Sequence, residues 1–129
     1  MNVVDSSGWV EYFFEGGNAA SFAATIEDTG QLLVPTICLY EVFKKVCLVA
    51  GESAGLKAVA HMQLGTVVDV SSQIALNAAQ LSIRHKLPMA DALIYSIGGL
   101  NDAVVWTQDE DFEGLPGVNY FAAPRAPNR

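Results

Sequence analysis

The chain of 129 residues has little charge, and this shortage excludes several classes of protein. Charged residues make up 16% of the sequence against 51% hydrophobic residues, a composition that excludes disorder as the main state. Only seven Lys and Arg residues stand against fourteen Asp and Glu residues. The resulting net charge of -7 excludes broad electrostatic attraction to nucleic acid or to an anionic membrane. Any contact with a nucleic acid must therefore be local.

Long apolar runs are also missing, because Glu, Lys, Asp or Gly interrupts each of them within a few residues. The first residues lack the basic start and the apolar stretch of a secretion signal. We therefore expect a cytoplasmic protein without membrane contact. The only two cysteines, Cys38 and Cys47, fall in one predicted helix, where their spacing puts them on opposite faces. They cannot form a disulfide bond with each other, and we expect both thiols in the core.

Apolar segments and helical patterns alternate along the chain, whose length fits one domain. The expected strands span residues 1–5, 32–34, 66–70, 103–106 and 118–121. The expected helices span residues 9–14, 19–28, 36–50, 52–64, 72–86 and 89–97. We expect Ser6 and Ser7 to cap the first helix and Gly98-Gly99 to stop the last one. The domain then covers residues 1–121, and residues 122–129 form a flexible tail.

The first four predicted strands are uniformly apolar, which is typical of parallel strands buried on both faces. With helices between them, they predict a three-layer α/β/α fold around a central, mostly parallel sheet of four to five strands. Sheets of this kind place their functional sites outside the carboxyl ends of the strands, where the strand order switches.

Four acidic residues adjoin the carboxyl ends of these strands. Asp5 ends the first strand, and Asp109 comes just after the fourth. Glu41 lies in the helix that follows the second strand, and Asp91 lies in the first turn of the last helix. Each has a structural explanation when taken alone, such as helix capping for Asp5 or a surface ion pair of Glu41 with Lys45.

Taken together, the four acids would need a positive partner. Two carboxylates about 4 Å apart repel each other by about 4 kcal/mol at an effective dielectric constant near 20. No Lys or Arg lies within two residues of Asp5, Asp91 or Asp109. We therefore expect a bound cation, and all-oxygen ligands favour Mg²⁺ or Mn²⁺ over Zn²⁺. His61 and His85 lack metal-ligand spacing, and we expect both at the surface or at helix ends.

Four motifs occur in order along nearly the whole chain: VVDSS at 3–7, PT at 35–36 with Glu41, LPMADALI at 87–94 and TQDEDF at 107–112. In this ordered set the sequence resembles the PIN-domain ribonucleases, and within them the VapC-type toxins of bacterial and archaeal toxin–antitoxin pairs. Each motif is common by itself, whereas the set in a chain of this length is a strong signal. The fold of that family agrees with the fold that the pattern predicts.

The resemblance implies a metal site and its supporting groups. Its catalytic and metal-binding acids would be Asp5, Glu41, Asp91 and Asp109, and its supporting hydroxyls would be those of Ser6 and Thr107. Asp111 is a second acid in the last motif, and we expect it to be solvated or supporting rather than a ligand.

The resemblance also implies an activity and partners. The activity is that of an Mg²⁺- or Mn²⁺-dependent endoribonuclease toxin, which hydrolyses phosphodiester bonds of RNA with metal-activated water. A small antitoxin would neutralise it, and family members usually form homodimers. The candidate phosphate contacts for RNA are Lys44, Lys45, Arg84 and Lys86, although all four also fit the role of solvated helix charges.

Other functions fit the sequence less well. A phosphoacceptor receiver domain would have a Lys beyond the fifth strand, and no Lys follows Lys86. A haloacid-dehalogenase-type phosphatase would have Asp-x-Asp after the first strand, where this chain has Asp5-Ser6-Ser7. A dinucleotide-binding fold would have a glycine-rich first turn, which is missing. The remaining alternative is a catalytically inactive PIN-like protein-binding scaffold, which the loss of one of the four acids would have favoured.

Overall fold

The computed structural model describes residues 1–124 and builds them around a five-stranded parallel sheet. The strands are β1 (Asn2–Val4), β2 (Leu32–Pro35), β3 (Thr66–Val68), β4 (Val104–Thr107) and β5 (Val118–Tyr120). Their order in the sheet is β3-β2-β1-β4-β5, and all neighbouring strands are parallel. The predicted fold class is confirmed.

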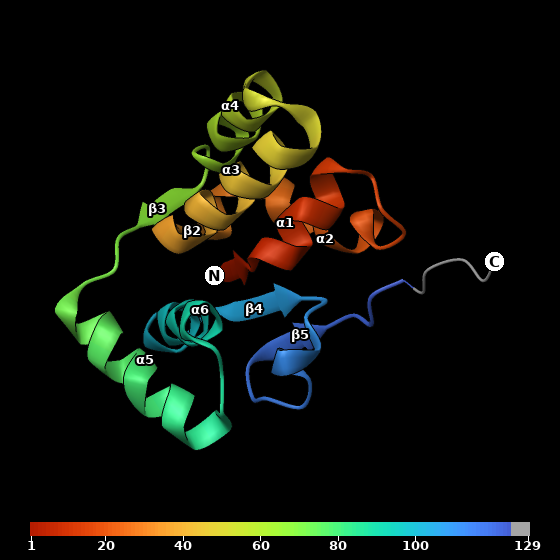
Figure 1. The fold of residues 1–129 in the computed structure, drawn as a ribbon. Helices are drawn as coiled ribbons and strands as arrows, with labels where there is room; N and C mark the ends of the chain where they lie inside the picture. Colours follow the sequence, from red (N-terminus) through yellow and green to blue (C-terminus); the bar gives the residue numbers. More distant parts are fainter. Residues whose placement is uncertain (125–129) are drawn as a thin grey trace.

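Helices cover both faces of the sheet. They are α1 (Ser6–Phe13), α2 (Ala19–Glu27), α3 (Thr36–Ala50), α4 (Glu52–Met62), α5 (Ser72–His85) and α6 (Met89–Leu100), with the short 3-10 helices η1 (Thr29–Gln31) and η2 (Glu110–Phe112). Figure 1 shows α1 to α4 gathered on one side of the strands and α5 and α6 on the other. This arrangement forms the three layers that the sequence predicts.

The strand order brings the start and the end of the chain together. The chain runs outward from β1 through β2 to β3, returns through α5 and α6, and adds β4 on the other side of β1. β1 pairs with β4 so that Val4 lies opposite Trp106. The order therefore switches between β1 and β4, and the residues that follow these strands meet at one edge of the sheet.

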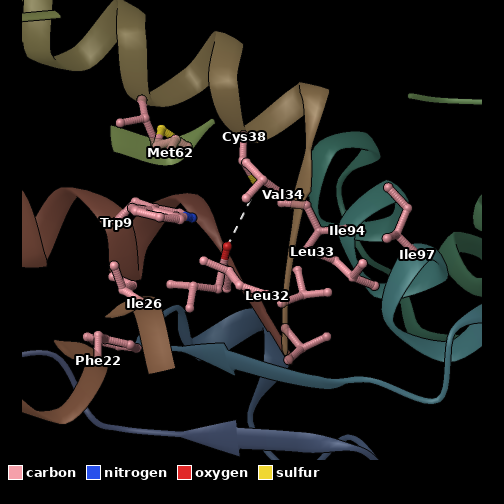
Figure 2. Packing of buried hydrophobic residues seen from close by; sticks show 14 of the residues in the cluster. Trp9, Phe22, Ile26, Leu32, Leu33, Val34, Cys38, Met62, Ile94 and Ile97 are labelled. Atoms are coloured by element: carbon pink, nitrogen blue, oxygen red, sulfur yellow. Dashed lines mark hydrogen bonds between the residues drawn. The ribbon is translucent and has the colours of Figure 1, made fainter. Parts of the chain in front are cut away.

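The core lies between the sheet and α1 to α4, with a second contribution from α6. Trp9 and Phe22 are fully buried there, close to Ile26 and Met62 (Figure 2). Cys38 is also fully buried, and its thiol donates a long hydrogen bond of 3.9 Å to the carbonyl of Val4 (Figure 2). The packing of α3 on β1 thus reaches the last residue before the candidate site.

The two cysteines lie in α3 and are not bonded to each other, as predicted. Only Cys38 is fully in the core, because Cys47 is half-buried against α4. His61 was expected at the surface or at a helix end, and it lies in the last turn of α4, where it is half-buried and packs edge-on against the rings of Trp9, Tyr12 and Phe13. This packing of α4 against α1 could not be predicted from the sequence of either helix alone.

Of the caps that the sequence offers for α1, the structure shows Asp5 rather than Ser6 or Ser7, because the Asp5 carboxylate accepts the backbone N–H of Gly8. Two other local expectations were wrong. β3 was expected to be buried, but it is an edge strand, and Thr66 and Val67 are exposed. The short helix η2 was not foreseen, because a loop was expected between β4 and β5.

The last helix was expected to stop at Gly98-Gly99, but α6 runs through both glycines to Leu100. Gly98 is buried against β4, where a Cβ atom would lie 2.7 Å from Cγ2 of Val105. Gly99 is exposed and a Cβ atom there would meet no neighbour within 4 Å. The first glycine therefore serves close packing of α6 on the sheet and is not a stop signal.

In the described part of the chain, no helix combines the length and the apolar character needed to cross a membrane. Residues 122–124 form neither helix nor strand. The rest of the predicted flexible tail, residues 125–129, lies outside the described residues.

The glycine pair gives a matched test of the packing. Gly98→Ala should lower the free energy of unfolding by about 1–3 kcal/mol, because the added methyl group would overlap a stiff, buried valine. Gly99→Ala should raise it by up to about 1 kcal/mol, because alanine favours the helix and the site is open. Urea unfolding of both variants measures the difference, and a Gly98→Ala protein as stable as the wild type would contradict the close approach.

Candidate functional site

The candidate site lies where β1 and β4 end side by side. The backbone N–H of Asp5 donates to the carbonyl of Trp106 over 3.0 Å, so the pairing of the two strands continues into the site. Asp5 follows β1 directly, and Thr107 is the last residue of β4. Strand pairing alone thus sets the first and the last sequence motif next to each other.

Asp5 is held by hydroxyl and backbone donors. Its carboxylate is only 2% exposed. Oδ1 accepts hydrogen bonds from Oγ of Ser7 at 2.7 Å and from the N–H of Gly8 at 3.1 Å. Oδ2 accepts from Oγ1 of Thr107 at 2.8 Å. The side chain therefore caps α1 and ties β4 to it in a single orientation.

Burial raises the pKa of Asp5 from 3.8 to about 6, although the hydrogen bonds from Ser7, Thr107 and Gly8 lower it. The nearby charge of Asp109 adds a small further rise. A buried carboxylate with a raised pKa is typical of a functional site, and it shows that the surrounding charges do not neutralise Asp5.

Two hydroxyl groups that contact Asp5 also hold the backbone of the loop after β4. Oγ1 of Thr107 accepts the N–H of Asp109 at 2.9 Å, and Oγ of Ser7 accepts the N–H of Gln108 at 3.2 Å. Both hydroxyls also donate to Asp5. Ser7 was considered only as a helix cap, and the sequence signal for its role is the second serine of the Asp5-Ser6-Ser7 run.

Glu41 comes to the site from α3, which begins directly after β2. Oγ of Ser6 donates to Oε1 of Glu41 over 2.7 Å. The predicted supporting hydroxyl of Ser6 therefore contacts Glu41, whereas that of Thr107 contacts Asp5. Glu41 is half-buried, so its carboxylate borders both the site and the solvent.

Three further carboxylates converge beside Asp5. Ligand oxygens of Asp91, Asp109 and Asp111 all lie within 4.8 Å of one another. Asp91 stands in the first turn of α6. Asp109 caps η2, where its Oδ1 accepts the N–H of Asp111 at 3.0 Å. The short helix η2 thus turns both aspartates of the last motif toward Asp91 of α6.

The crowding of negative charge is visible in Asp91. Its pKa is raised from 3.8 to about 7, mainly by burial and then by the charge of Asp109, a hydrogen bond shared with Asp111 and the charge of Asp5. The cluster therefore holds a proton near neutral pH unless a cation takes its place. All of its donor atoms are oxygens, which suits a hard divalent ion such as Mg²⁺ or Mn²⁺.

The structure groups the predicted acids in a particular way. Asp91 and Asp109 share one compact cluster, and the unexpected third member is Asp111. Asp5 stands behind this cluster, close enough for its charge to raise the pKa of Asp91, and Glu41 joins through Ser6. The assignment of catalytic and metal-binding roles to these residues stays a prediction.

The four predicted phosphate contacts are exposed. Lys44 and Lys45 lie on α3, within one helical turn of Glu41. Arg84 is in the last turn of α5, and Lys86 follows that helix in a left-handed conformation. Only the pair on α3 adjoins a residue of the candidate site in the sequence.

Comparison with known proteins agrees with this architecture. The family model of the PIN domain matches residues 3–118. No protein of curated function matches the chain by sequence.

Solved structures of similar fold include a toxin–antitoxin complex and a toxin. A chain of a toxin–antitoxin complex from Klebsiella pneumoniae has a TM-score of 0.75 and 23% identity, covering 92% of this chain and 96% of its own. VapC20 from Mycobacterium tuberculosis, described as a toxin that cleaves the sarcin–ricin loop, has a TM-score of 0.76 and 18% identity. The alignment with VapC20 covers 90% of this chain and 95% of the other. With this fold and a family match over nearly its whole length, the chain belongs to the PIN domain family.

Proposed function

We propose that the protein is a metal-dependent endoribonuclease of the VapC toxin type, which hydrolyses phosphodiester bonds of RNA. The observation that carries this proposal is the cluster of Asp91, Asp109 and Asp111 beside the buried Asp5. A structural role does not require so many acids at one edge of the sheet, since their mutual repulsion destabilises the fold.

The carboxylates of Asp91, Asp109 and Asp111 would hold Mg²⁺ or Mn²⁺. A bound divalent ion of this kind lowers the pKa of the attacking water and offsets the charge of the scissile phosphate. Asp5 fixes the position of Asp109 through Thr107 and adds negative charge behind the cluster.

Glu41 has a different role in this proposal. Oε1 accepts the hydroxyl of Ser6, which fixes the orientation of the carboxylate. The other oxygen, Oε2, is then available to orient a water molecule or to accept its proton. Since Glu41 comes from α3 and the other acids come from β1, α6 and the loop after β4, the site forms only in the folded protein.

The proposal of a toxin rests on the similar structures. They include toxin–antitoxin complexes from several bacteria, and VapC20 is described as a toxin that cleaves the sarcin–ricin loop. We therefore propose a small antitoxin protein as the natural inhibitor and RNA as the substrate. The inactive scaffold remains the alternative, and no feature of the described residues favours it, because all four predicted acids lie at the same edge.

The predicted homodimer would bury apolar surface on the α5 and α6 side. Leu76, Ile83 and Met89 are 71%, 83% and 75% exposed. A second copy that covers these side chains would gain about 25 cal/mol for each Å² of apolar surface removed from water. The molar mass of the purified protein, measured by light scattering, tests this part of the proposal.

Replacing Asp5 should separate folding from activity. Asp5→Asn keeps the acceptor for Gly8 but removes the charge, so RNA cleavage in Mg²⁺ or Mn²⁺ should be nearly abolished while the circular dichroism spectrum is retained. Asp28→Asn, at an exposed acid at the end of α2, is the matched control and should cleave like the wild type. Cleavage by the wild type should also stop when a chelator is added. Undiminished cleavage by Asp5→Asn would contradict the assigned site.

The third acid of the cluster can be tested by metal binding. Asp111→Asn should weaken the affinity for Mn²⁺ about tenfold or more, because it removes one of three converging carboxylates. Glu113→Gln removes an exposed acid two residues further on, outside the cluster, and should bind Mn²⁺ like the wild type. Calorimetric titration measures both. Equal affinities of the two variants for Mn²⁺ would show that Asp111 is not a ligand, which is the expectation from the sequence.

Stability should depend on pH in a defined direction. The folded protein holds protons on Asp5 and Asp91 that the unfolded chain releases near pH 4, because burial raises both pKa values. The metal-free protein should therefore lose stability as the pH rises from about 5 to about 7.5, by about 1.4 kcal/mol for Asp5 alone. Urea unfolding measures this loss, which Mg²⁺ should reverse and Asp5→Asn should reduce. A metal-free stability that rises over this interval would refute the charge crowding.

A further inference from the structure

One surface of α3 next to the candidate site carries an aromatic ring that does not contribute to the core. Tyr40 is 61% exposed, which makes it the most exposed aromatic residue of the protein. It precedes Glu41 in the sequence, so both side chains start from the same turn of α3. An isolated exposed tyrosine is ordinary, and a binding role needs further observations.

The first of these is the position of a cation. Nζ of Lys44 lies over the ring of Tyr40, 5.8 Å from its centroid. Lys45 follows directly, so α3 places two of the seven basic residues of this acidic protein beside one aromatic ring. An aromatic ring combined with adjacent basic side chains is the chemistry that binds single-stranded nucleic acid, where the ring stacks on a base and the cation contacts a phosphate.

The second observation is a hollow in the surface. A cavity of about 250 Å³ is lined by Tyr40, Glu41, Lys44, Lys45 and Leu48. This volume is below the range of about 300–1,000 Å³ typical of pockets for drug-sized ligands. The hollow therefore suits a single planar group better than a complete cofactor.

The hollow and the candidate site share one residue, Glu41. The carboxylate of Glu41 accepts the hydroxyl of Ser6, next to Asp5, and the same residue lines the hollow. The lining has two positive charges and one negative charge. A strand of RNA that extends from the acidic cluster past Glu41 would thus meet a net positive surface.

We propose that Tyr40 and Lys44 form a subsite for a nucleotide that flanks the scissile phosphate of single-stranded RNA. The ring of Tyr40 stacks on the base, and Lys44 moves from the ring to the phosphate. Since every base has a stacking face, the subsite tolerates different sequences and favours unpaired segments over duplexes. This inference rests on the proposed nuclease function and assigns to it a residue for holding the substrate.

The test measures RNA binding separately from cleavage. The anisotropy of a labelled single-stranded RNA of about eight nucleotides, in the presence of a chelator, gives the affinity without turnover. Tyr40→Ala should weaken binding about fivefold or more, and Tyr40→Phe should bind like the wild type because the ring is kept. Lys44→Ala should also weaken binding and reduce the slope of affinity against salt concentration by about one. Lys57→Ala, at an exposed lysine of α4, is the matched control for charge and should bind like the wild type.

Cleavage and mass measurements complete the test. If the wild type cuts RNA with Mg²⁺ or Mn²⁺ but Tyr40→Ala binds RNA as tightly as the wild type, the subsite is refuted and the nuclease stands. If the wild type does not cut RNA with either ion, the nuclease is refuted and the subsite with it. If Tyr40→Ala retains its RNA affinity but changes the molar mass or loses a bound antitoxin, this face is a protein interface, which also overturns the subsite.

Discussion

The parallel pairing of β1 with β4 is the constraint on which the rest of the site depends. It joins residues about a hundred positions apart and ends in the buried carboxylate of Asp5, which accepts hydrogen bonds from both sides of the pairing. The same two hydroxyls that donate to Asp5 accept the backbone N–H groups of Gln108 and Asp109. The loop that carries the last motif is therefore positioned both by the sheet and by side chains of the motif itself.

Electrostatic repulsion and packing act against each other at this edge. The pKa values of Asp5 and Asp91 are raised because the fold buries carboxylates that would otherwise be hydrated. The hydrophobic core behind β1 supplies the free energy that keeps them there, since Val3, Val4 and Val34 are almost completely buried. A fold with carboxylates at this edge is less stable than one with apolar side chains there. The uncompensated negative charge of these carboxylates is what allows the site to attract a cation.

Much of this architecture could be predicted from residue patterns. Uniformly apolar strands alternating with helices indicated the parallel sheet, and acids after the strands indicated the edge at which they gather. Contacts between distant segments could not be predicted in the same way. The place of Asp111 depends on the turn of η2, and the burial of Gly98 depends on how closely α6 approaches Val105. At Gly98 a local rule gave the wrong role, because tertiary packing overrides the local preference of a glycine pair to end a helix.

Cys38 belongs to α3, and its buried sulfur lies against Val4 at the end of β1, behind the acidic edge. Burial raises the pKa of this thiol, and the charges of Asp5, Glu41 and Asp91 raise it further, although a hydrogen bond with Ser6 lowers it. The buried sulfur is therefore neutral and adds no charge behind the acidic edge. The groups that this edge presents to a cation are carboxylate oxygens alone.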